Sequence, residues 1–222
     1  MEQINKQKTM EQKIINNLEG QLRGLEDNVE ETRKVTFIAS TSSVDRHGTV
    51  VNQKNWNIEK FNANPIVGYQ HNVYGGEEAN PDDQLGSARA YFETVKKGAV
   101  EEQQLMVDIT FEPREINEKA DKIFRKIQHG SLRAVSVGFI PVADDNGSMG
   151  ENREGAFHYF GQELLEISVV NIPSNPDALK RSLLDLVKEP KIEVKEVEEV
   201  TKKENVKSQR ELLLLLKNKL NK

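Results

Sequence analysis

The stretch Leu132-Arg-Ala-Val-Ser136-Val-Gly138-Phe139 is an apolar, β-branched run of the kind that forms a buried strand. With a side-chain period of two, Ser136 shares one strand face with Ala134 and Gly138, whereas Arg133 and Phe139 share the other. A buried hydroxyl is costly unless another polar group satisfies it. The run therefore predicts a strand whose serine has a polar partner from elsewhere in the chain.

Two other apolar segments each contain one polar, reactive side chain. They are Gly68-Tyr-Gln-His71-Asn72 and Leu164-Leu-Glu166-Ile-Ser-Val-Val-Asn-Ile-Pro173. His71 closes a strand-like run before a loop, and Glu166 shares a predicted strand face with Leu164, Ser168 and Val170. The three segments together would supply a nucleophile, a base and an orienting acid. Spacing alone does not establish a triad, because such residues meet in space and in different chain orders. Taken singly, a histidine at a strand end or a serine within a strand is more often structural than catalytic.

The pattern around these segments predicts an α+β fold that is rich in strands. Strand-like runs are separated by clusters of Gly, Asn, Asp and Pro. Seven strands favour a closed or nearly closed antiparallel barrel with surrounding helices. One helix is predicted over residues 115–129, with an apolar stripe that includes Ile116 and with Gly130 as its C-terminal stop. A second helix is predicted from about Pro176. The predicted strands are 35–40, 66–70, 86–92, 105–111, 132–139, 157–160 and 164–170.

Composition divides the chain into residues 1–33, 34–187 and 188–222. The first segment has a short heptad seam, with Ile15, Leu18, Leu22, Leu25 and Val29 in a or d positions. It is either an amphipathic helix that packs on its own domain or stays partly disordered, or a segment that binds a partner or is removed. In the third segment, twelve of the twenty residues from Lys188 to Lys207 are Lys or Glu, which indicates a solvated linker or a weak helix. The run Leu212 to Leu216 follows, and some of its leucines must contact another surface.

The overall composition excludes several classes of function. The net charge is −5, so the chain lacks the basic field that attracts nucleic acid. It contains no cysteine, which excludes a thiolate nucleophile and a Cys-ligated zinc site. No apolar run approaches the length of a membrane span, so we expect no membrane partner and no signal peptide. His47, His129 and His158 form no His-Glu-x-x-His motif. We therefore expect no metal and no cofactor, and a metal-dependent hydrolase is a minor alternative.

The three segments together resemble the tailed-phage prohead proteases, the capsid maturation serine proteases related in fold to herpesvirus assemblin. The resemblance covers about residues 35–180, and the strand with Ser136 and the stretch Glu166-Ile-Ser-Val-Val-Asn-Ile-Pro173 are its most specific parts. A strand followed by the turn Asp45-Arg-His-Gly48-Thr-Val50 also fits the family pattern. The polar loop 144–154 and the Glu/Lys tail do not match it.

The resemblance implies roles for three residues and a place of action. Ser136 would be the nucleophile, His71 the general base and Glu166 the third member that orients the imidazole. Relatives in the superfamily use a second histidine in the third position. The enzyme would cleave scaffold and major capsid protein precursors, and itself, inside the immature procapsid in the host cytoplasm. The predicted partners also include a second copy of the chain, in a homodimer.

Two questions remain open at the level of sequence. The first is whether the chain is instead a non-enzymatic capsid scaffold or assembly module, which its charged and leucine-rich tails would also suit. The second is the identity of the oxyanion-hole donors. Arg133 is a poor candidate, because it lies on the opposite strand face from Ser136.

Overall fold

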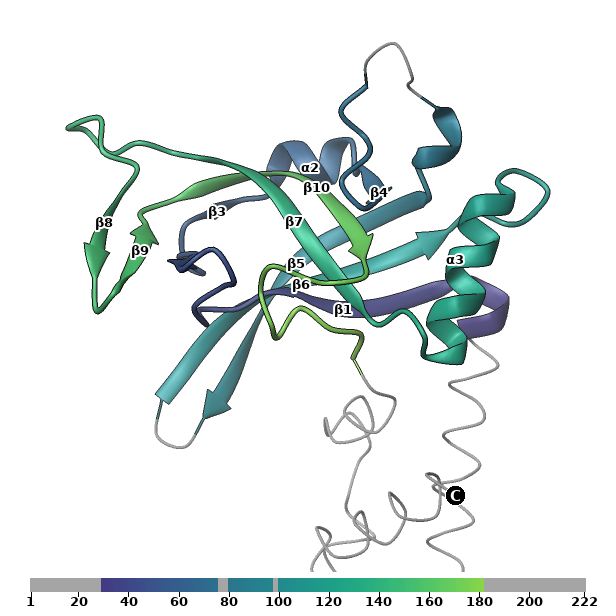
Figure 1. The fold of residues 1–222 in the computed structure, drawn as a ribbon, viewed down its shortest axis with the longest axis horizontal. Helices are drawn as coiled ribbons and strands as arrows, with labels where there is room; N and C mark the ends of the chain where they lie inside the picture. Colours follow the sequence, from purple (N-terminus) through teal and green to yellow (C-terminus); the bar gives the residue numbers. More distant parts are fainter. Residues whose placement is uncertain (1–28, 76–79, 98–99, 182–222) are drawn as a thin grey trace, which may run out of the picture. The chain divides into compact units, whose positions relative to one another are not determined.

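The computed structural model describes residues 29–75, 80–97 and 100–181, which form a strand-rich α+β fold (Figure 1). The predicted α+β, strand-rich class is therefore confirmed. All seven predicted strands are present, with shifted ends. Most of the heptad seam, the Glu/Lys segment and the leucine run lie outside the described residues.

The first sheet contains three antiparallel strands in the order β1 (Lys34–Ser40), β6 (Val100–Phe111) and β5 (Gly86–Lys97). Alternate residues of β1 point into the core, where Val35, Phe37 and Ala39 are almost completely buried. Figure 1 shows β5 and β6 as a long hairpin that extends away from the rest of the sheet.

The second sheet is centred on β10 (Gln162–Val170). β7 (Ala134–Pro141) pairs with one edge of β10 in antiparallel fashion, whereas β3 (Trp56–Asn57) and β4 (Val67–Tyr69) run parallel along its other edge. In this register Ser168 lies between Ser136 on β7 and Gly68 on β4. Parallel β3 and β4 mean that this sheet is mixed and not purely antiparallel as predicted.

A β-bulge in β10 corrects one sequence prediction. The register shifts between Leu164, which pairs with Phe139, and Glu166, which pairs with Gly138. Leu165 is the extra residue, so Leu164 and Glu166 point to opposite faces. Leu164 accordingly joins the hydrophobic core with Ile167. The prediction that Leu164 shares a face with Glu166 is therefore wrong, since it assumed an unbroken period of two.

The smallest elements lack a sequence pattern long enough to predict. The third sheet has the order β2 (Thr49–Val50), β9 (Ala156–Tyr159) and β8 (Gly150–Arg153), and β8 falls within the polar segment 144–154 that was expected to be a loop. A five-residue helix, α2 (Glu59–Ala63), and a 3₁₀ turn, η1 (Pro81–Asp83), complete the short elements.

The main helix, α3 (Glu118–His129), begins three residues later than predicted. Asn117 caps it, because its side chain accepts a hydrogen bond from the Ala120 N–H at 2.9 Å. Ile116 thus precedes the helix and is 69% exposed, so it is not part of the apolar stripe. Gly130 ends the helix in the left-handed conformation, as predicted.

The second predicted helix is absent over the described residues 175–181, which corrects that prediction. Asn175 forms a side-chain turn instead of a helix cap, accepting from Asp177 N–H and donating to the Thr41 carbonyl at 3.0 Å. Leu179 and Lys180 form isolated bridges to β7 and β1. The competing hydrogen bonds of the sheet edges therefore hold this segment extended.

The same extended segment connects the first two sheets. Leu179 accepts a hydrogen bond from Ile38 N–H at 3.1 Å, and Lys180 N–H donates to the Arg133 carbonyl at 2.6 Å. On the other side, Leu85 N–H donates to Val67 of β4 at 2.8 Å. No closed barrel is found in the described part of the chain, and the seven-stranded barrel stays a prediction. One buried cluster, which includes Phe37, Val107, Phe124, Ile167 and Val169, joins the sheets and α3.

Candidate active site

His71 is placed by a left-handed turn that follows β4. Gln70 and His71 have φ values of 57° and 61°, a region that costs a residue with a side chain about 1 kcal/mol or more. Two hydrogen bonds to β10 hold the turn: Gln70 N–H donates to the Val169 carbonyl at 3.0 Å, and His71 N–H donates to Ser168 Oγ at 3.1 Å. The turn thereby brings the imidazole back towards β10.

His71 and Glu166 form a short hydrogen bond. Nδ1 of His71 lies 2.6 Å from Oε1 of Glu166, and because a carboxylate only accepts, Nδ1 carries the proton. The Glu166 side chain is 2% exposed, whereas that of His71 is 40% exposed. The hydrogen bond to Glu166 raises the pKa of His71 above 6.5, against the opposing effect of burial, and the carboxylate charge raises it further.

Ser136 lies on the same sheet face as Glu166, and its partner on β10 is Ser168, two residues after Glu166. Gly138, two residues further along β7, pairs with Glu166. Directly opposed Cβ atoms in such a pair are about 4.5–5.5 Å apart. Ser136 is buried, and no hydrogen bond of its hydroxyl is found among the described residues. Because Nδ1 of His71 is bound to Glu166, its Nε2 remains for a nucleophile.

Ser168 is a residue of this site that sequence reasoning did not select. Its hydroxyl donates to Oε2 of Glu166 at 2.7 Å and accepts from the His71 backbone. The available signal was its place two residues after Glu166 on the same strand face. Serine is so common in strands that this position alone has no functional meaning.

Two glycines leave the space that the polar side chains occupy. A Cβ atom at Gly138 would overlap with Oε1 of Glu166 and with the Tyr74 hydroxyl, and one at Gly68 would lie 2.6 Å from Ser168 Oγ. Tyr74, from the loop after His71, is therefore a second site residue that the sequence did not indicate. Burial, followed by the charge of Glu166, raises the pKa of Tyr74.

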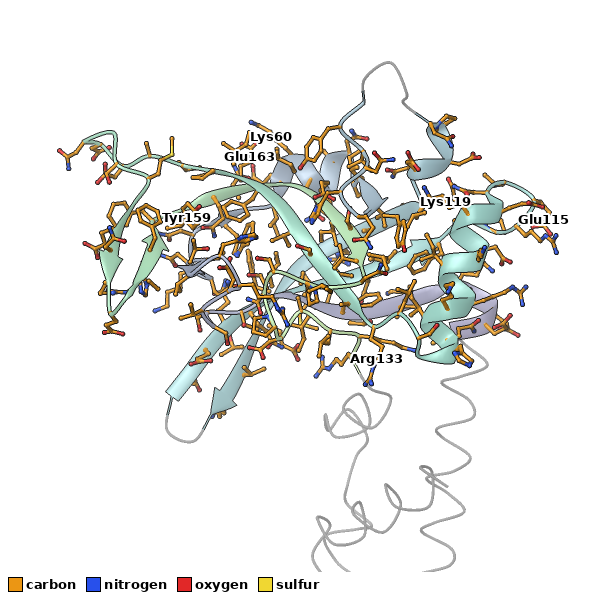
Figure 2. The ribbon with its side chains drawn as sticks, in the orientation of Figure 1. Lys60, Glu115, Lys119, Arg133, Tyr159 and Glu163 are labelled. Atoms are coloured by element: carbon orange, nitrogen blue, oxygen red, sulfur yellow. The ribbon has the colours of Figure 1, made fainter. Side chains whose placement is uncertain are left out.

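A partly buried ion pair supports the turn from the side of α3. Asn72 donates to Oδ2 of Asp83 at 2.6 Å, and Asp83 also pairs with Lys119 near the start of α3, a residue labelled in Figure 2. Asp83 is 6% exposed. The residue next to His71 is thus connected to the helix through a carboxylate with two partners.

His47 and His158 have contacts outside this cluster. His47 donates its N–H to Asp45 in the predicted Asp/Gly turn, where Asp45 also accepts from Thr49. The ring nitrogens of His158 on β9 face Arg153, at 3.2 Å from its guanidinium and 3.0 Å from its carbonyl oxygen. No group of three or more possible metal ligands is found in the described ranges.

Arg133 is exposed, and Figure 2 shows it at the edge of the described fold. A hollow of about 320 Å³ lies between β2, β9 and the β5–β6 hairpin, and none of the three predicted catalytic residues lines it.

None of the described helices is both long and apolar enough to span a membrane.

Comparisons with known proteins test the predicted family. The family model of the caudovirus prohead serine protease matches residues 102–190. This range includes Ser136, Ser168 and Glu166 but not His71. The comparison with curated proteins finds no match, and neither does the comparison with solved structures. The match indicates a serine peptidase, that is, a hydrolase, and over residues 102–190 it confirms the predicted resemblance to the caudovirus prohead serine proteases.

Proposed function

We propose that the protein is a serine endopeptidase that matures phage proheads, with Ser136 as nucleophile, His71 as general base and Glu166 as orienting acid. The observation that carries the proposal is the 2.6 Å contact between His71 and Glu166, beside a buried Ser136 on the same sheet face. The family match over the strands of Ser136 and Glu166 supports it independently.

The proposed chemistry is acyl transfer through an ester on Ser136. Oγ of Ser136 attacks the scissile carbonyl carbon while its proton passes to Nε2 of His71. The tetrahedral intermediate breaks its C–N bond, and His71 returns the proton to the departing amine. A water molecule, deprotonated by His71, then hydrolyses the ester and regenerates the serine.

Glu166 has two tasks in this scheme. By accepting from Nδ1, it fixes the tautomer in which Nε2 is free to take the proton of Ser136. Its negative charge also stabilises the imidazolium that forms during attack. The raised pKa of His71 is the ground-state expression of the same interaction.

The proposed substrates are the precursors of the scaffold and the major capsid protein, and the protease itself. We place the reaction inside the immature procapsid in the host cytoplasm, where enzyme and substrate are confined together. Residues 34–187 would form the protease domain, in an assemblin-like barrel, and segments 1–33 and 188–222 would serve delivery. A homodimer is part of this proposal. The enzyme needs no high affinity for its substrates there, because confinement in a closed shell gives both a high effective concentration.

A fluorophosphonate probe tests the assignment directly. We expect the full chain to be labelled at Ser136, as mapped by peptide mass spectrometry, and Ser136→Ala to abolish both labelling and cleavage of capsid precursor. Ser40→Ala is the matched control, because Ser40 is also buried in a strand and its hydroxyl accepts a hydrogen bond from Gln53, outside the candidate site. An unlabelled wild-type chain that still assembles with capsid protein would favour the non-enzymatic scaffold instead.

A further inference from the structure

Ser168 connects the proposed base and its orienting acid through a single hydroxyl. It is completely buried at the centre of the second sheet, between Ser136 and Gly68. Its Oγ donates to Oε2 of Glu166 at 2.7 Å and accepts from the backbone N–H of His71 at 3.1 Å. A serine hydroxyl has one proton to donate, so the proton of Ser168 is fully engaged.

The hydrogen bond to Glu166 selects which carboxylate oxygen faces the histidine. With Oε2 bound to Ser168, Oε1 points to Nδ1 of His71. Glu166 and Ser168 lie on one strand, two residues apart, so the backbone of β10 fixes the position of both. A carboxylate without that second bond would be free to rotate about its last torsion angle, which is broad.

The second hydrogen bond stabilises the backbone of His71. The left-handed turn at Gln70 and His71 is unfavourable for residues with side chains. The Ser168 hydroxyl satisfies the His71 N–H there, which β4 no longer reaches because the strand ends at Tyr69. The same atom therefore fixes both partners of the His71–Glu166 contact.

We propose that Ser168 is a positioning residue that aligns His71 and Glu166 for proton transfer from Ser136; this rests on the proposed function. Ser168 is not the nucleophile, because its proton is donated to Glu166 and its side chain is inaccessible to a polypeptide substrate. A displacement of about 1 Å in such a group lowers rates by about 10²-fold. We expect Ser168→Ala to reduce the rate of Ser136 modification by about this factor.

The test compares the full chain with Ser168→Ala, Glu166→Gln, the double variant and the control Ser40→Ala. One readout is the rate constant of Ser136 labelling by a fluorophosphonate, which needs no protein substrate. The other is the pKa of His71 from NMR titration of the imidazole signals. The chain has four histidines, so single substitutions at the other three assign the signal.

We expect Ser168→Ala to slow labelling about 10²-fold and to lower the pKa of His71, because the Glu166 hydrogen bond that raises it is no longer held. In the Glu166→Gln background the further loss should be much smaller, since residues that act through one contact are not additive. Ser40→Ala should match the wild type in both readouts.

Labelling of Ser168→Ala within threefold of the wild type, with the pKa of His71 unchanged or higher, would overturn the proposal. Full additivity with Glu166→Gln would also overturn it. If the alanine variant does not fold, Ser168→Cys keeps the shape of the side chain with a weaker donor, and the same two readouts apply. A wild type that is not labelled would contradict the proposed function, whereas the His71 titration would still report whether Ser168 holds the pair.

Discussion

At the scale of single residues, the site is a set of buried polar atoms that satisfy one another. Both oxygens of Glu166 are occupied, one by His71 and one by Ser168, in a side chain that is 2% exposed. A buried carboxylate without hydrogen-bond partners at this position would carry a large free-energy cost. A side chain at Gly138 would overlap with Glu166, and one at Gly68 would overlap with Ser168.

The first prediction concerns charge. Glu166→Gln should lower turnover by about 10⁴-fold, because an amide fixes neither the tautomer nor the imidazolium. His71 must be neutral to act as base, so activity rises with pH through its pKa. Glu166 raises that pKa, and Glu166→Gln should therefore move the acidic limb of kcat/KM to lower pH. A pH–rate profile of the variant with an unshifted limb would contradict the role of Glu166.

The second prediction concerns space. Gly138→Ala should displace the carboxylate of Glu166, because the new methyl group overlaps with Oε1 and with the Tyr74 hydroxyl. We expect a stability loss of about 1–3 kcal/mol in urea unfolding and greatly reduced labelling of Ser136. Gly161→Ala is the matched control, since its nearest new contact is an ordinary 3.4 Å. Equal behaviour of the two variants would show that Gly138 is not needed for the site.

At the scale of elements, the site is assembled by β10 and the turn after β4. β10 presents Glu166 and Ser168 on one face, and its bulge at Leu165 turns Leu164 into the core. The turn presents His71 only because it is fastened, through Ser168 to β10 and through Asn72 to Asp83. The geometry of this candidate site therefore depends on the hydrogen bonds that hold a left-handed turn in place.

A third prediction follows from that attachment. Asn72→Ala should reduce kcat/KM about tenfold or more while changing the free energy of unfolding by about 1 kcal/mol, the net value of one hydrogen bond. Asn62→Ala serves as control, because the Asn62 side chain also makes partly buried hydrogen bonds, in this case with the backbone of Ala90 and from α2. Steady-state kinetics and urea unfolding of both variants are the measurements. Unchanged kinetics in Asn72→Ala would mean that the turn holds without Asp83.

At the scale of the whole molecule, the last described segment connects the first sheet to the second. Residues 178–181 bond to β1 and β7, and Val135 N–H donates to the Ala178 carbonyl at 3.1 Å. This segment adjoins the strand that contains Ser136. Residues 178–181 are therefore an integral part of the described fold.

The fourth prediction separates domain from tail. A chain that ends at residue 187 should fold and be labelled at Ser136 like the full chain, but fewer copies should co-purify with immature particles. A chain that ends at residue 177 should lose the bonds to β1 and β7 and unfold at lower urea concentration. Normal packaging of the chain that ends at 187 would assign delivery to residues 1–33.

The sequence by itself determined the α+β class, the seven principal strands, the helix with its Gly130 stop and the three candidate catalytic residues. The class, the strands and the helix depend on local sequence patterns and turn residues, which a single sequence displays directly. The three candidate residues were selected because their segments resemble those of a known family. The tertiary structure decided the bulge at Leu165, the extended course of residues 178–181 and the position of Ser168 between Glu166 and His71. Each of these is a choice between competing hydrogen bonds, and the winning partner comes from a distant part of the chain.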